Sequence, residues 1–148
     1  MVTRRALLGA GALALLAGCG PQEEPPADAS AVLSEQLRLT QAVADAYSGV
    51  AGEGGVGASR RVEKLEAALR AAGGTPPRVA SGATGVEAAL AAEQAALRGH
   101  VAAVGELEDP TYRELLAGLI ADAAASESAL LTMLKRPAAP TAFPGQPV

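Results

Sequence analysis

The sequence predicts an all-α protein, an up-down four-helix bundle formed by residues 29–136. Apolar residues recur at spacings of three and four, and no strand-like alternation competes with this period. About a quarter of the residues are Ala, which favours helices and lets them approach closely. Start and stop signals divide the chain into four segments. We expect helices at about residues 29–51, 58–72, 85–107 and 110–136.

Residues with known capping roles mark the ends of these helices. Thr84-Gly85-Val86-Glu87 matches a capping box, in which a hydroxyl and a carboxylate satisfy free backbone N–H groups. Asp109-Pro110 places an N-cap before a proline at the first helical position. Gly73-Gly74 and the following Pro76-Pro77 end the second helix. Lys135-Arg136 supplies the positive charge that a helix C-terminus favours.

The first nineteen residues indicate where the protein works. The basic pair Arg4-Arg5 precedes an apolar run over residues 6–17, which is the order of a secretory signal, here residues 1–18. The run is too short for a transmembrane helix. Leu16-Ala17-Gly18-Cys19 resembles a bacterial lipobox, whose cysteine is acylated and becomes the new N-terminus. We therefore expect a lipoprotein held at the outer face of the plasma membrane through fatty acyl chains such as palmitate on Cys19.

The sequence leaves two features of the termini undecided: the export route and the position of the C-terminal tail. The pair Arg4-Arg5 after Thr3 resembles a twin-arginine signal, but a general secretory signal also carries basic residues there. Residues 19–28, rich in proline and glutamate, are expected to form a lipidated tether without fixed structure. Residues 137–148 predict an extended Pro-rich tail carrying Phe143, which either docks on the bundle or hangs free.

Composition excludes several functions. The net charge of −4 disfavours a nucleic-acid partner, because phosphate binding needs a basic face. One histidine and one cysteine cannot supply zinc-ligand spacing. No G-x-S-x-G turn supports a hydrolase, and the Gly-rich stretch 52–57 lacks the lysine and the preceding strand of a phosphate-binding loop. We predict no cofactor and no catalytic residue.

Glutamates interrupt the apolar stripes of the third and fourth helices. Glu93 and Glu127 lie where apolar residues would continue each stripe. Inward carboxylates are costly unless they are paired, hydrogen-bonded or ligated. The residues allow either a polar site inside the bundle or a position at each stripe edge, with the carboxylate in water. The stripes are Ala58, Val62, Leu65, Leu69 and Ala72 in the second helix; Val86, Leu90, Leu97, Val101 and Val104 in the third; and Leu116, Ile120, Ala123, Leu130 and Leu134 in the fourth.

Other polar residues lie near these stripes. His100, one heptad after Glu93, is expected to be solvated or packed at an edge, with a role as a ligand the less favoured alternative. Tyr47 is expected to be a core ring with a hydrogen-bonded hydroxyl. Arg60-Arg61 is expected to be solvated. Gln36 and Thr40 share a face of the first helix with Leu33, Ala44 and Tyr47.

Four helices with inward glutamates on the third and fourth resemble the ferritin-like superfamily, most closely the actinobacterial ferritin-like lipoproteins of the DUF4439 family. The resembling stretches are residues 69–77, 90–104 and 116–134, within a domain of about residues 30–136. Metal-binding members hold two ions with a Glu from each of two helices and Glu-x-x-His from the other two. The corresponding positions here are Thr40; Ala58 and Arg61; Glu93; and Glu127 and Leu130.

Only Glu93 and Glu127 match the ligand pattern, so the resemblance implies the fold without its di-metal site. The favoured hypothesis is therefore a non-enzymatic, membrane-anchored interaction module with an unknown protein partner. An alternative is a small-ligand or metal binder built around Glu93, Glu127 and His100. A residual oxidoreductase is the third hypothesis, which the missing histidines disfavour.

Overall fold

The computed structural model describes residues 27–137. Several predictions concern the residues outside this range. The signal at 1–18, the lipidated Cys19, the tether up to residue 26, and the tail beyond residue 137 all lie outside the described residues.

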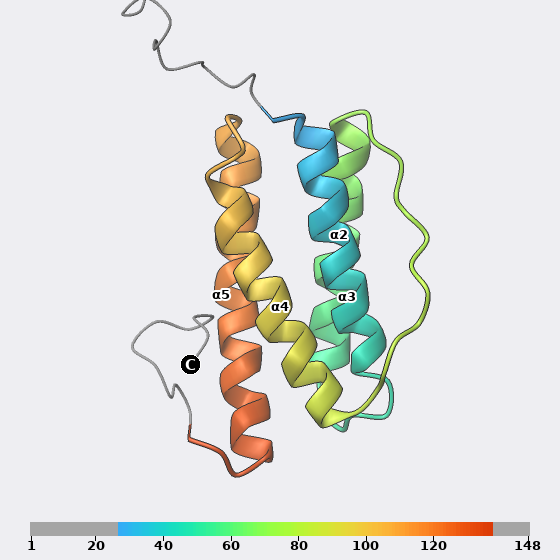
Figure 1. Cartoon of the computed structure of the whole chain (residues 1–148), viewed down its shortest axis with the longest axis vertical. Helices are drawn as coiled ribbons and strands as arrows, with labels where there is room; N and C mark the ends of the chain where they lie inside the picture. Colours follow the sequence, from blue (N-terminus) through green and yellow to red (C-terminus); the bar gives the residue numbers. More distant parts are fainter. Residues whose placement is uncertain (1–26, 138–148) are drawn as a thin grey trace, which may run out of the picture.

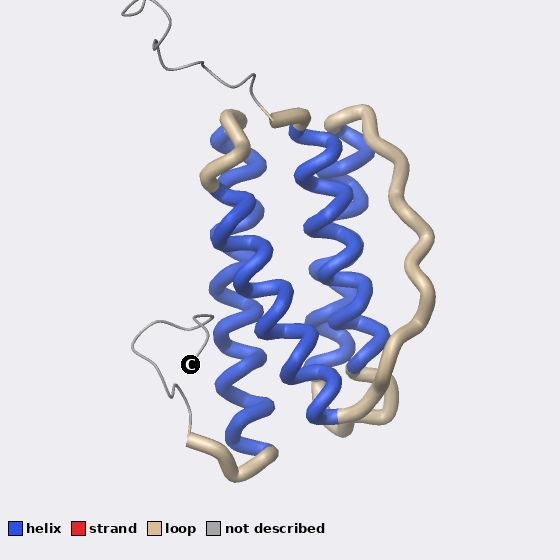
Figure 2. Tube along the Cα trace, viewed as in Figure 1, coloured by secondary structure: helices blue, strands red, loops and turns tan. Residues whose placement is uncertain are grey.

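The described residues form four α-helices and no strand, which confirms the all-helical bundle (Figure 2). The helices are α2 (Ala29–Ala46), α3 (Gly54–Ala71), α4 (Val86–Val104) and α5 (Pro110–Met133). The first helix ends earlier than predicted and the second begins earlier. Gly49 and Gly52 have φ values of +80° and +108°, which a continuing helix cannot contain.

The predicted up-down topology, in which each helix runs antiparallel to the one before it, fails at one connection. The peptide N–H of Gly85, before α4, donates to the carbonyl of Ala46 at the end of α2 (2.9 Å). Residues 72–85 therefore cross the length of the bundle, and α4 runs parallel to α3 (Figure 1). α2 packs between α3 and α4, and α5 packs mainly on α4 and only lightly on α3. Every packed pair is antiparallel, and the two parallel pairs lie on the diagonals.

The helix ends follow most of the predicted caps. The side chain of Asp109 accepts a hydrogen bond from the N–H group of Thr111 at 2.7 Å, as predicted. Asp28, which was predicted to belong to the tether, caps α2 by accepting from the N–H group of Ser30 at 2.9 Å. Gly73 has a left-handed φ of +82°, which closes the end of α3. The predicted capping box is wrong: Gly85 is itself the N-cap of α4 and no side chain caps this helix. The tertiary hydrogen bond of Gly85 sets the local conformation and leaves Thr84 outside the cap.

The buried face of α4 is rotated from the predicted stripe by about one residue. Val101 is 52% exposed, whereas His100 is fully buried. Three of its buried residues are alanines, and Glu93 and His100 bring polar side chains to the centre of the bundle. The buried residues of α4 are Ala89, Leu90, Glu93, Ala96, Leu97, His100 and Ala103.

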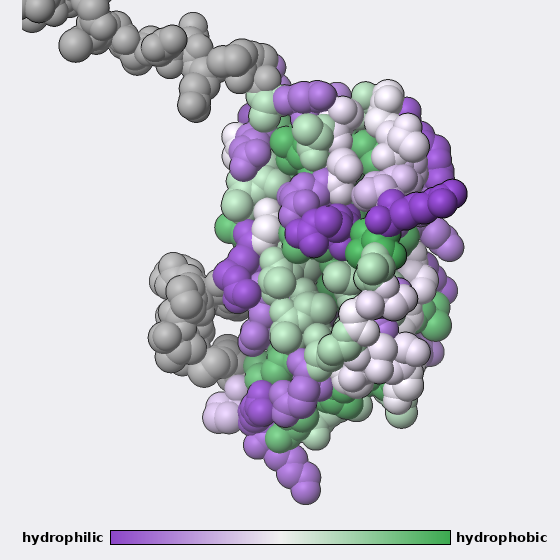
Figure 3. Space-filling model, turned by 45° about the vertical axis from the view of Figure 1, so that its right-hand side comes forward, coloured by the Kyte–Doolittle hydropathy of each residue, from purple (hydrophilic) through white to green (hydrophobic). Residues whose placement is uncertain are grey.

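The surface is poor in large apolar side chains although much of it is alanine. Figure 3 shows weakly hydrophobic areas between hydrophilic side chains on one side of the molecule. Within residues 27–137, α5 alone is long and apolar enough to cross a membrane by length and composition. α5 packs mainly on α4 in the bundle.

A matched glycine pair tests the packing at the start of α3. A Cβ on Gly54 would overlap the ring of Tyr47, whereas a Cβ on Gly57 would meet nothing within 4 Å. We expect Gly54→Ala to destabilise the protein by about 1–3 kcal/mol, because the rigid ring must move. Gly57→Ala should stabilise it by up to about 1 kcal/mol through helix propensity. Urea unfolding of both variants measures the two changes; equal effects would contradict the Tyr47 packing.

Candidate functional site

Buried polar side chains divide the core into two apolar clusters. On every helix one buried polar residue stands between the residues of the two clusters: Thr40 on α2, Arg61 on α3, His100 on α4 and Glu127 on α5. Gln36 and Glu93 complete this group, which we call the polar belt. The cluster toward the start of α2 includes Leu33, Leu37, Leu65, Leu69, Leu107, Leu116 and Leu119; the other includes Val43, Tyr47, Ala58, Leu90, Leu130 and Leu131.

The centre of the polar belt is an ion pair between Arg61 and Glu93. The guanidinium donates to both carboxylate oxygens, with N–O distances of 2.5 and 2.8 Å. The side chains are 3% and 0% exposed, so water does not screen the pair. The Tyr47 hydroxyl donates a further hydrogen bond to Glu93 Oε1 at 3.2 Å. The end of α2 and the middle of α3 are thereby tied to one carboxylate in the middle of α4.

The pKa shifts follow from this geometry. Burial alone would lower the pKa of Arg61, but the hydrogen bond and the charge of Glu93 outweigh it and the pKa is raised. Burial and then the charge of Glu93 raise the pKa of Tyr47 to about 12. Arg61 therefore stays a cation and Tyr47 stays a neutral hydrogen-bond donor at physiological pH. A guanidinium cation and a neutral hydroxyl therefore both donate to the Glu93 carboxylate.

His100 forms the second contact of the belt. Its Nδ1 lies 2.9 Å from Oε1 of the buried Gln36 amide. Because that carbonyl oxygen can only accept, Nδ1 carries the proton and Nε2 keeps its lone pair. Nε2 is buried without a hydrogen-bond partner. Burial, followed by the positive charge of Arg61, lowers the pKa of His100 to about 4, so the ring is neutral.

Glu127 has different hydrogen-bond partners from Glu93. Its Oε1 accepts a hydrogen bond from Gln94 Nε2 at 2.9 Å, and its Oε2 is buried without a partner. The side chain is 8% exposed, so its carboxylate is nearly as enclosed as that of Glu93 but has no cation beside it. The two glutamates therefore have different partners: a guanidinium for one and a neutral amide for the other.

The structure decides the alternatives that the sequence left open. Glu93 and Glu127 are both buried, as a polar site inside the bundle requires, and the prediction for Tyr47 is confirmed. The expectation of a solvated or edge-packed His100 is wrong, since the ring is fully enclosed. Arg61 is likewise buried rather than solvated, while Arg60 is exposed.

Sequence reasoning missed the partners of these residues. Arg61 lies one position before Val62 in the apolar stripe of α3, and its spacing from Ala58 and Leu65 already placed it on that face. An inward glutamate on another helix was the signal that could have paired it. No such signal pointed to Gln36 and Gln94, because amide side chains are also common on the exposed faces of helices.

The donor set does not fit a di-metal centre. Both oxygens of Glu93 are bound by a guanidinium, whose charge repels a cation. Nδ1 of His100 and Oε1 of Glu127 are also bound to amides. Within residues 27–137 no group of three or more His, Cys, Asp or Glu side chains is arranged to hold a metal ion. What the belt can do chemically is compensate charge and fix helix positions.

Comparisons with known proteins add no assignment: no family model, curated protein or solved structure matches the chain.

A double-mutant cycle tests the central ion pair. Glu93→Leu or Arg61→Met alone should destabilise the fold by about 3–5 kcal/mol, because each leaves an uncompensated buried group. The combined Arg61→Met and Glu93→Leu change should recover most of that loss, since two apolar side chains need no partner. Urea unfolding measures all four proteins. Additive losses would contradict a direct pair.

His100 predicts a specific pH dependence of stability. Its pKa is about 4 when folded and about 6.5 when unfolded, so the unfolded chain binds the proton first as the pH falls. The stabilisation is complete above pH 6.5 and is lost down to about pH 4, by up to about 3 kcal/mol. Wild type should therefore lose more stability over this range than His100→Gln, in paired urea titrations. Parallel pH profiles would contradict the buried neutral ring.

Proposed function

We propose that the chain is a lipid-anchored extracytoplasmic lipoprotein whose ferritin-like bundle has lost its di-metal site and acts as a non-enzymatic interaction module. One observation carries this proposal. The guanidinium of Arg61 lies at the centre of the bundle and occupies both oxygens of Glu93. An internal cation thus takes the role that a metal ion has in metal-binding members of the family.

Two features of the fold support the ferritin-like assignment. One long crossover joins α3 to α4, and ferritin-like bundles have a single connection of this kind (Figure 1). The positions that the resemblance assigns to metal ligands are also buried on all four helices. They are Thr40, Ala58, Arg61, Glu93, Glu127 and Leu130, each at most 8% exposed.

The proposal of a membrane anchor rests on the sequence around Cys19. Ala27, where the described chain begins, is eight positions after Cys19 in the sequence. An extended chain of that length reaches at most about 28 Å, so the start of α2 would stay close to the lipid surface. An interaction module in this position meets partners at the membrane.

One specific observation favours a second candidate function. Glu127 Oε2 is buried without a partner, as the acceptor of a small-ligand site would be. This alternative, a ligand or metal binder using Glu93, Glu127 and His100, is distinguished from the first by direct binding measurements.

Metal titration separates the two. We expect wild type to bind no stoichiometric Co²⁺, Zn²⁺ or Fe²⁺ at micromolar concentration, because Arg61 compensates Glu93. A variant with Thr40→Glu, Ala58→Glu, Arg61→His and Leu130→His should gain two Co²⁺ ions with ligand-field absorption bands, provided that circular dichroism shows it folded.

Two results would contradict this prediction. Stoichiometric binding by wild type that disappears in Glu127→Leu and Glu93→Gln would establish the ligand binder instead. A folded variant that binds no metal would contradict the ligand positions that the ferritin-like resemblance assigns to the four helices.

The N-terminus supplies the second test. Mass spectrometry of protein purified from membranes of a bacterial expression host should show Cys19 as the first residue, carrying acyl chains. Replacement of Cys19 by Ser should release the protein from the membrane fraction. A mature chain that retains residues 1–18 would contradict the anchor.

A further inference from the structure

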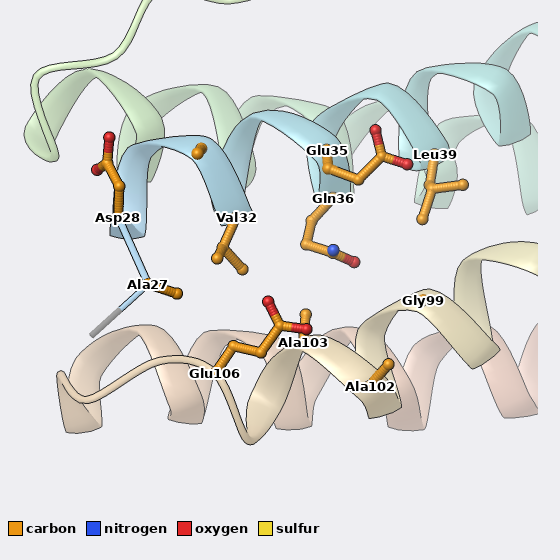
Figure 4. A pocket seen from close by; sticks show the side chains of 11 residues that line it. Ala27, Asp28, Val32, Glu35, Gln36, Leu39, Gly99, Ala102, Ala103 and Glu106 are labelled. Atoms are coloured by element: carbon orange, nitrogen blue, oxygen red, sulfur yellow. The ribbon is translucent and has the colours of Figure 1, made fainter. Parts of the chain in front are cut away.

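A groove opens between α2 and α4 on the side where the described chain begins. It has a volume of about 460 Å³ and is lined from both helices, as Figure 4 shows. At one end Leu39 lies against Gly99, where an added Cβ would overlap its side chain. Away from this contact the facing residues are small: Ala31 on α2, and Ala102 and Ala103 on α4. Gln36 and Leu39 of α2 reach across to α4, and the groove is the space that these alanines leave open beside them.

The groove combines an apolar floor with an acidic rim. Val32, Leu39 and Ala103 contribute apolar surface, and Asp28, Glu35 and Glu106 stand around it (Figure 4). None of the eleven lining residues is basic. The charge of Glu35 is matched by Arg38 at 2.6 Å, but neither Asp28 nor Glu106 has an ion pair among residues 27–137. The groove therefore carries uncompensated negative charge.

Gln36 adds a fixed polar group to the floor. Its Oε1 accepts from His100, so the amide is held in one orientation from inside the bundle. No hydrogen bond among the described residues uses its Nε2. Two amide hydrogens are thus left to donate at the base of the groove, beside apolar surface. The polar belt and the groove meet at this residue.

We infer that this groove binds one face of a basic amphipathic helix from a partner protein, which deepens and rests on the proposed interaction module. The apolar side chains of that helix enter the groove, and its Lys or Arg side chains pair with Asp28 and Glu106. Helix-in-groove recognition of this kind suits a cleft between two helices, and the alanines allow a close approach. Residues 138–148 of this chain contain no Lys or Arg, so they lack the complementary charge.

The test uses the full chain in a zwitterionic detergent and a labelled peptide of about 18 residues, built from Lys, Leu and Ala with one apolar stripe. Fluorescence anisotropy compares it with a peptide in which Glu replaces every Lys. We expect binding of the Lys peptide at least about tenfold tighter than of the Glu peptide, with an affinity that falls as salt rises.

Matched variants locate the binding. Ala102→Phe fills the groove and Glu106→Lys reverses its rim, and each should weaken the Lys peptide about tenfold or more. Both sites are exposed, so the core is unaffected. The controls Ala67→Phe and Glu53→Lys, which are exposed on α3 and at its N-cap, should stay within roughly twofold of wild type.

Three outcomes would overturn the inference. The first is equal weakening by groove and control variants, or equal binding of both peptides. The second is self-association of the chain that Ala102→Phe abolishes, which would make a second copy the occupant. The third is displacement of the Lys peptide by a peptide of residues 138–148. Stoichiometric metal binding by wild type would instead contradict the proposed function and leave the groove result standing.

Discussion

The ion pair between Arg61 and Glu93 is the interaction on which the rest of the core depends. Both side chains are nearly inaccessible to water. Burying either charge without the other would destabilise the folded state by several kcal/mol, so the carboxylate and the guanidinium must be paired. Their bidentate contact sets the rotation of α3 and α4, and Tyr47 adds the end of α2 to the same carboxylate. That rotation explains why His100 is enclosed while Val101 faces solvent.

The polar belt also relates fold to function. A bundle with two apolar clusters and polar residues at mid-height has the layout of a site, yet both oxygens of Glu93 are bound by a guanidinium, and Glu127 and His100 each have one atom hydrogen-bonded to an amide. A protein with this interior is better suited to presenting a rigid outer surface than to binding an ion within. Our proposals therefore place recognition on the outside of the helices, in the groove that small residues leave open between α2 and α4.

Much of the fold could be predicted from the sequence because its signals are local. Periodicity, the cap at Asp109 and the glycine stop at Gly73 act within a few residues, so helix identity and most helix ends followed. The crossover could not be predicted in the same way. Residues 72–85 contain no element of their own, and their path depends on a hydrogen bond from Gly85 to Ala46, far away in the chain. With this bond in place, Gly85 is the N-cap of α4 and the predicted capping box does not form.

The sequence by itself determined that four amphipathic helices form and that two of them carry a glutamate on the apolar face. Helical period alone is sufficient for this, because it fixes which residues share a side. Only the tertiary structure decided which buried polar groups are partners: Arg61 with Glu93, His100 with Gln36, and Gln94 with Glu127. A rotation of about one residue changes the contacts of every long side chain, and packing between helices, not periodicity, sets that rotation.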